Sequence, residues 1–229
     1  MRSALVFLVV GVTALLSGCA EPLQRSLRFN PDVLSTHGRV GVAMTPVPKP
    51  NTEFPGAGCL LCMATAEAAH STLSSYVQSL PTDDLSRLKE DFAEALRKKG
   101  VDAIVISEPL VVDALAENSA KGANIARRDF TPLKVKYKID KLVVFSIGKH
   151  GISRSYSSYV PTGDPRGVLR ATGYIVNLND NTYDWYKTVV VSRAGERNWD
   201  EPPKFPAITN VYFEAIERGK DSFMEPLGQ

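Results

Sequence analysis

One uninterrupted apolar stretch, Leu142-Val143-Val144-Phe145, limits the folds open to this chain more than any other segment. A strand with one face in water alternates apolar and polar residues, whereas a strand covered on both faces is apolar throughout. We therefore expect residues 141–147 to form a central strand of a sheet that is covered on both sides.

Helix and strand patterns alternate along the rest of the chain. The clearest helix follows Pro81, because Thr82 is a suitable N-cap and Gly100 suits the position after the last turn, near residue 99. We expect further helices at 60–80, 110–117, 133–139 and 207–224, a loop at 46–58, and strands at 40–45, 101–106, 168–178 and 183–192, with a turn at 179–182. On the 60–80 helix, the expected packed face holds Leu61, Ala64, Ala68 and Val77. This order predicts a single α/β domain over residues 38–229, a mixed sheet of about five strands with helices packed on it.

The first residues form a targeting segment rather than part of the fold. Arg2 precedes an apolar run from Ala4 to Leu16, which is shorter than the roughly 20 residues of a membrane span. Its length is typical of the apolar region of a signal peptide. We expect residues 1–18 to be this signal peptide, and no later apolar run approaches the length of a membrane span.

The residues that end this segment, Leu16-Ser17-Gly18-Cys19, resemble a bacterial lipobox. The resemblance implies that a membrane peptidase cuts before Cys19 and that the Cys19 thiolate carries a diacylglyceryl group. Several acyl chains together make a durable anchor. Because Ala20 rather than Asp follows, the family's sorting rule implies the outer membrane, facing the periplasm, with residues 19–37 as a lipidated tether. The alternative is an ordinary signal peptide followed by a cysteine that occurs there by chance.

Charge and motifs exclude several functions. The 27 Lys and Arg against 25 Asp and Glu give a net charge of +2, which is too balanced for an electrostatic nucleic-acid binder. The chain has no nucleophile elbow, Walker loop, dinucleotide-binding glycine fingerprint or metalloprotease motif. Gly148-Lys149-His150-Gly151 resembles a phosphate loop only superficially, and we expect a turn there. We therefore nominate no catalytic residue, metal site or cofactor.

Two cysteines remain besides Cys19. Beyond the inner membrane, Cys59 and Cys62 are expected to form a disulfide, because that compartment is oxidising. Its loop is too short for a large entropic stabilisation. The alternatives are a local structural bridge or a membrane-tethered thiol–disulfide oxidoreductase, since a Cys-x-x-Cys pair at a helix start lowers the thiol pKa. His70 is the one nearby histidine, so the pair and this histidine provide fewer ligands than the four of a structural zinc site.

The most interesting exposed segment is Ser153 to Pro161. Arg154, Tyr156 and Tyr159 are candidates for binding a partner, and the alternative is that the tyrosines pack inward. Trp199 is expected to be exposed and is a fourth candidate. Trp185 is expected to pack in the 168–192 hairpin. Arg127 and Arg128 are expected in a solvated turn, with contact to anionic lipid or glycan headgroups as the alternative.

The chain as a whole resembles periplasm-facing lipoproteins with a TolB amino-terminal-like α/β fold. The group includes the curli secretion lipoprotein, the penicillin-binding-protein activator LpoB and the Pel export lipoprotein. The resemblance rests on the lipobox, the 39–42 strand, the 96–101 turn, the 138–143 segment and the 178–185 hairpin. It implies a non-catalytic, lipid-anchored envelope protein that binds an envelope protein or glycan, or assembles into a homo-oligomer. The 59–62 cysteine pair departs from the group's pattern.

Overall fold

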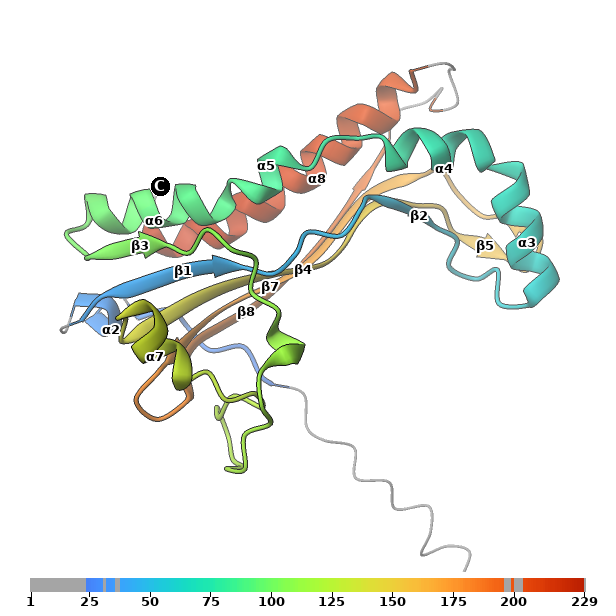
Figure 1. Ribbon diagram of the computed structural model, residues 1–229. Helices are drawn as coiled ribbons and strands as arrows, with labels where there is room; N and C mark the ends of the chain where they lie inside the picture. Colours follow the sequence, from blue (N-terminus) through green and yellow to red (C-terminus); the bar gives the residue numbers. More distant parts are fainter. Residues whose placement is uncertain (1–23, 31, 36–37, 196–198, 200–203, 229) are drawn as a thin grey trace, which may run out of the picture.

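The computed structural model describes residues 24–30, 32–35, 38–195, 199 and 204–228 (Figure 1). They form a mixed α/β fold with one principal sheet, in the order β3-β1-β4-β7-β8, and β2 pairs with the far part of β4. The strands are β1 (Val40–Met44), β2 (Asn51–Glu53), β3 (Ala103–Val105), β4 (Lys141–Ser153), β7 (Arg166–Asn177) and β8 (Thr182–Ala194). The pairs β1–β3, β1–β4 and β2–β4 are parallel, whereas β4–β7 and β7–β8 are antiparallel. The expected α/β class is confirmed.

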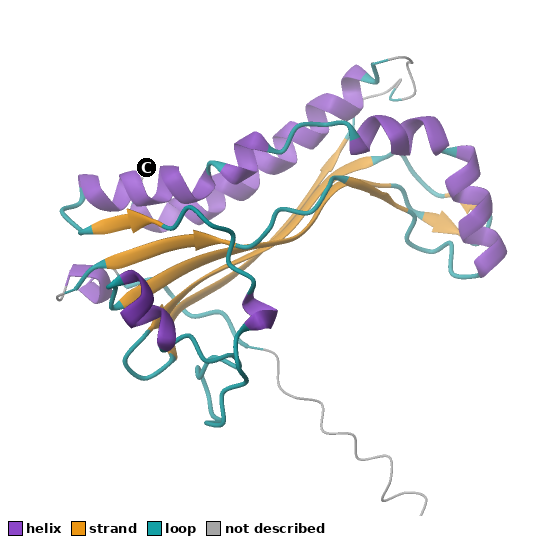
Figure 2. Cartoon of the chain, in the orientation of Figure 1, coloured by secondary structure: helices purple, strands orange, loops and turns teal. Residues whose placement is uncertain are grey.

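Helices cover the sheet on both sides (Figure 2). The helices are α2 (Asp32–Ser35), α3 (Leu60–Ala69), α4 (Ser71–Gln78), α5 (Asp83–Ser86), α6 (Leu88–Lys98), α7 (Pro132–Tyr137) and α8 (Pro206–Met224), with short 3₁₀ turns η1 (Val112–Ala114) and η2 (Glu225–Leu227). One buried cluster joins a face of the sheet to α4, α5, α6 and α8. A second cluster joins the opposite face to α7 and the long 106–133 connection. None of the helices in the described part of the chain is both long and apolar enough to cross a membrane.

The apolar stretch is the central strand that the sequence predicts. Val143 and Phe145 belong to the cluster under α6 and α8, while Leu142 and Val144 belong to the cluster on the opposite face. All four side chains are fully buried. Trp185 of β8 is also buried, as expected, and stacks on Phe92 of α6 with ring centroids 6.2 Å apart.

The expected turn at 148–151 is wrong, because β4 continues through it to Ser153. A register shift between Ile147 and Lys149 admits the glycine-rich segment into the antiparallel ladder with β7. Gly151 has φ +140°, and a Cβ there would lie 2.0 Å from the Asn51 carbonyl oxygen. Glycine here therefore allows the close approach of β2, a strand in a segment where the sequence predicts only a loop.

The long helix expected at 60–80 is broken at His70 into α3 and α4. Of its expected packed face, Val77 is buried on α4, as predicted, but Leu61, Ala64 and Ala68 are exposed, and the buried side chains of α3 are Cys62 and Ala66. The helix expected at 82–99 divides at Arg87, and its N-cap Thr82 makes no side-chain capping bond.

Other element predictions have mixed outcomes. Gly100 has φ +83° after α6, as its role at a helix end predicts. Of the helix expected at 110–117, only the 3₁₀ turn η1 forms. The helix expected at 207–224 is confirmed as α8, with Ile208, Val211 and Tyr212 buried.

Candidate functional site

The far end of the long β-strands carries a small separate structure, which we call the distal tip. It consists of β2, the 54–59 loop, α3 and a short ribbon of β5 (Tyr156–Ser157) and β6 (Val160–Pro161). Figure 1 shows this tip at the opposite end of the molecule from α7. It has its own buried cluster: Phe54, Ala57, Cys62, Ala66 and Tyr156.

A tight backbone contact joins the two halves of the tip. Gly56 has φ +91°, and a Cβ at this position would lie 1.9 Å from the Tyr156 carbonyl oxygen. The Tyr156 amide donates to the Pro55 carbonyl at 2.7 Å, and the Ser158 amide donates to the Gly56 carbonyl at 3.1 Å. Glycine is therefore the residue that lets the β5 segment lie against the 54–57 loop.

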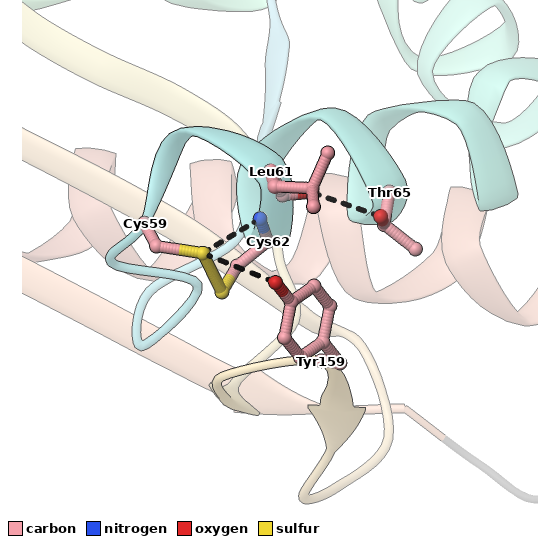
Figure 3. The surroundings of a disulfide bond; sticks show 5 residues. All are labelled: Cys59, Leu61, Cys62, Thr65 and Tyr159. Atoms are coloured by element: carbon pink, nitrogen blue, oxygen red, sulfur yellow. Dashed lines mark hydrogen bonds between the residues drawn. A yellow bond between two sulfur atoms is a disulfide. The ribbon is translucent and has the colours of Figure 1, made fainter.

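The two cysteines of the tip form a disulfide at the start of α3 (Figure 3). Cys59 is the N-cap, its Cα lies 5.0 Å from that of Cys62, and its Sγ accepts a hydrogen bond from the Cys62 amide at 2.9 Å. The Tyr159 hydroxyl donates to the same sulfur at 3.6 Å. Cys59 is exposed, whereas Cys62 is buried. Cys59 is therefore the cysteine of the pair that lies at the surface.

Large apolar side chains are exposed on the two segments that meet at this disulfide. Leu60 and Leu61, the two residues between the cysteines, are 95% and 68% exposed. Tyr159 and Val160 on the β5–β6 ribbon are 50% and 64% exposed. We call these four residues the apolar patch. A cluster of exposed apolar side chains on two adjoining segments is typical of an interaction site, whereas isolated ones are ordinary.

Behind the patch, Arg154 lies among aromatic rings. Its guanidinium carbon lies 4.5 Å from the centroid of the Trp199 ring, and its Nη1 donates to His70 Nε2 at 2.9 Å. The Tyr156 hydroxyl lies 2.7 Å from the same His70 nitrogen. Burial first, and then the Arg154 charge, lowers the pKa of His70 below its ordinary value. The imidazole is therefore neutral at pH 7, and Nε2 serves as an acceptor.

Of the four residues that the sequence nominates for partner binding, Tyr156 and Tyr159 lie in the distal tip, and Arg154 and Trp199 pack beside it. Their exposure differs: Tyr159 is half exposed, whereas Tyr156 is 8% exposed and packs inward. Trp199 is partly buried rather than exposed, because its ring contacts Arg154 and the His70 ring. The signal peptide and Cys19 lie outside the described residues.

Sequence reasoning missed Leu60, Leu61 and His70. The signal for the leucines is the pair of large apolar residues inside a four-residue disulfide loop, because so short a loop cannot bury both. The contacts of His70 with residues 84 and 86 positions away have no local signal. In the described part of the chain, no group of three or more His, Cys, Asp or Glu side chains is placed to hold a metal ion.

No family model matches the sequence, and no curated protein matches it. Solved structures with a similar arrangement include a Xanthomonas campestris protein of family DUF330, at 12% identity, covering 89% of this chain and 90% of that one, with a TM-score of 0.42. A Neisseria meningitidis lipoprotein shows 13% identity, 79% and 95% coverage and a TM-score of 0.29. A PelC dodecamer from Paraburkholderia phytofirmans shows 12% identity, 82% and 86% coverage and a TM-score of 0.31.

Proposed function

We propose that this protein is a non-catalytic, lipid-anchored protein of the outer membrane, facing the periplasm, whose distal tip binds a partner protein of the cell envelope. The lipobox-like segment that ends at Cys19 supports the anchor. The single observation that supports partner binding is the apolar patch of Leu60, Leu61, Tyr159 and Val160.

The chemistry of the patch favours a protein over a glycan. Two leucines, 95% and 68% exposed, offer no hydrogen bonds to the hydroxyls of a sugar, but they fit an apolar pocket of a protein. Burying a leucine side chain stabilises a complex by about 1.5–3 kcal/mol. The disulfide also fixes the backbone on both sides of Leu60 and Leu61, which lowers the entropy lost on binding.

Site-specific photo-crosslinking in intact cells tests this function. A photoreactive residue replaces Leu61, and the control carries it at Val135, which is 83% exposed on α7 at the other end of the molecule. We expect a crosslink to one identified envelope protein from position 61 and none from position 135. The purified partner should bind the wild type at least tenfold more tightly than the Leu60→Glu/Leu61→Glu variant, since each leucine supplies about 1.5–3 kcal/mol.

Two results would overturn the proposal. Identical crosslinks from positions 61 and 135 would show that the patch has no specific partner. A crosslink to a second copy of this chain would make the patch a self-association surface instead. Val135→Glu serves as the matched charge control in the binding measurement, because it replaces an exposed apolar residue away from the tip.

The placement of the two sulfurs favours a second candidate function, thiol–disulfide exchange. Cys59 is the exposed cysteine, and its Sγ accepts hydrogen bonds from the Cys62 amide and the Tyr159 hydroxyl, which would also stabilise a Cys59 thiolate. A thiolate of a partner dithiol would attack Cys59 Sγ, and Cys62 Sγ would leave with the electron pair and take up a proton. The partner's second thiolate would then attack its own sulfur in the mixed disulfide and release the Cys59 thiolate. The partner dithiol is thereby oxidised and the Cys59–Cys62 disulfide reduced, with two electrons transferred.

Thiol titration of the reduced protein distinguishes this second function from a structural bridge. A Cys59 thiol pKa below 7, raised by Tyr159→Phe, together with a reduction potential near those of periplasmic oxidants, supports exchange. An ordinary thiol pKa and a disulfide that thiols reduce slowly would show that the bridge only shapes the tip.

A further inference from the structure

A pocket of about 510 Å³ lies far from the distal tip, on the face of the sheet opposite α8. Tyr174, Tyr183 and Tyr186 line its floor on β7 and β8, and Lys121, Arg127 and Arg128 line it from the 118–129 segment. Its volume is in the range of small-molecule sites. The pocket is therefore large enough for a headgroup-sized ligand.

The three tyrosine rings form one contiguous aromatic surface. The ring centroids lie 5.4 Å apart for Tyr174 and Tyr183, 5.8 Å for Tyr174 and Tyr186, and 5.2 Å for Tyr183 and Tyr186. Tyr174 is 7% exposed. Burial raises the pKa of Tyr174 and raises that of Tyr183 to about 12. Both hydroxyls are therefore protonated donors at neutral pH.

Positive charge lies above this aromatic floor. Arg128 is held in place, because its guanidinium donates to the Leu115 carbonyl at 3.2 Å and to Asp113 at 3.3 Å. The charge of Arg127 acts on the Tyr183 hydroxyl, where it opposes the effect of burial on the pKa. Two carboxylates, Asp113 and Glu117, also line the pocket, and Arg128 pairs with the first. The pocket thus combines cationic groups with neutral hydroxyl donors, a combination that suits an anion.

The start of the described chain runs beside this pocket. Leu27 forms an antiparallel bridge with Tyr186, and its amide donates to the Tyr186 carbonyl at 2.8 Å. Gln24 Nε2 donates to Asn124 Oδ1 at 3.1 Å, in the segment that also carries the three cations. Cys19 is five residues before Gln24, so their Cα atoms are separated by at most about 18 Å. A lipid on Cys19 would therefore bring the pocket close to the membrane surface.

We propose that this pocket binds the phosphate of an anionic phospholipid headgroup in the membrane that holds the anchor. The inference rests on the proposed lipid anchoring at Cys19. A phosphodiester accepts hydrogen bonds from tyrosine hydroxyls and from lysine and arginine, and tyrosine is favoured at the interface between lipid and water. Such a contact would hold this face of the domain against the membrane.

Vesicle flotation of the chain from Ala20 to Gln229 tests the pocket without the lipid. This chain keeps every residue of the three buried clusters, the first of which is Phe29. We expect binding to vesicles of three parts phosphatidylcholine to one part phosphatidylglycerol, and not to pure phosphatidylcholine. Lys121→Ala/Arg127→Ala should weaken binding about 30-fold, since each cation near an anionic surface contributes about fivefold.

Controls separate the pocket from general charge and from the proposed function. Lys98→Ala/Lys99→Ala removes the same charge at the end of α6, on the other side of the sheet, and should bind like the wild type. The Leu60→Glu/Leu61→Glu variant should also bind vesicles like the wild type, so the vesicle measurement does not depend on whether the distal tip binds a partner. Mass spectrometry of Cys19 in cells tests the anchor separately.

Three outcomes would overturn the proposal. Equal binding to both vesicle types would exclude recognition of an anionic headgroup. Equal losses in the α6 control variant would reduce the effect to net charge. Saturable binding of glycerol phosphate or inorganic phosphate, with no preference for anionic vesicles, would assign the pocket to a soluble phosphate compound instead.

Discussion

Replacing Gly56 with alanine should disrupt the distal tip while the main fold stays intact. A non-glycine residue at φ +91° costs about 1–3 kcal/mol. The new Cβ would also lie 1.9 Å from the Tyr156 carbonyl oxygen, so the β5 segment must move away. That movement breaks the two amide hydrogen bonds that Tyr156 and Ser158 donate to the 55–56 carbonyls, each of which contributes about 1 kcal/mol. The local cost is therefore about 3–5 kcal/mol.

Amide hydrogen exchange measures this local loss of stability at individual residues of the distal tip. In Gly56→Ala, protection of the Tyr156 and Ser158 amides should drop by about 140- to 4,000-fold, since a factor of ten corresponds to about 1.4 kcal/mol. Protection in β4 near Val143 should be unchanged. Gly58→Ala is the matched control, because a Cβ there meets no atom within 4 Å. Wild-type protection in Gly56→Ala, or an equal loss in Gly58→Ala, would refute the argument that this close approach holds the tip together.

Two further substitutions test the interior. His150 is 3% exposed, and its Nε2 donates to the Pro48 carbonyl at 2.7 Å. Burial lowers the pKa of His150 below the ordinary 6.5, so the unfolded chain takes up a proton at a higher pH than the folded chain does. As the pH falls below 6.5, the free energy of unfolding therefore falls by up to about 1.4 kcal/mol per pH unit. Between pH 7 and 5, urea unfolding should show a smaller loss of the free energy of unfolding for His150→Gln than for the wild type. An equal loss in the two proteins would contradict a lowered pKa of His150. The Asn181 side chain hydrogen-bonds to three backbone groups of the 126–130 segment, and the Asn181 backbone has φ +60°. Asn181→Ala should therefore lower the free energy of unfolding by about 2–4 kcal/mol. Asn181→Gly should lower it by about 1 kcal/mol less, because glycine adopts a positive φ without strain. Equal losses in both variants would show that the positive φ carries no cost.

The central part of the fold could be predicted because its signals are local. Four apolar residues in succession at 142–145 need cover on both faces, and the two buried clusters supply it. The far half of β4 could not be predicted, because Gly148 and Gly151 favour a turn locally. Pairing with β2 and β7 overrides that preference.

At the distal tip, too, the sequence predicts local features but not contacts between distant segments. The tyrosines of the 153–161 segment are conspicuous in the sequence, and they do lie at the tip. Which face of α3 packs is set by Tyr156, which is 94 positions after Cys62, so helical spacing alone favoured Leu61 wrongly. The contact of Trp199 with Arg154 and His70 likewise depends on chain segments that meet only in the fold.

The long strands separate the proposed lipid contact from the proposed partner contact within one domain. Val144 of β4 pairs with Tyr174, which in turn pairs with Tyr186, so this level of the sheet carries the tyrosine pocket and the bridge to Leu27. Ser153 ends the same strand nine residues later, about 30 Å away at about 3.3 Å per residue. Because β4, β7 and β8 are continuous over this distance and α8 packs along β7 and β8, the two ends are joined by a hydrogen-bonded sheet rather than by a linker. The tyrosine pocket and the distal tip therefore lie at separate places along one continuous sheet, so the two proposed sites can be altered separately by mutation.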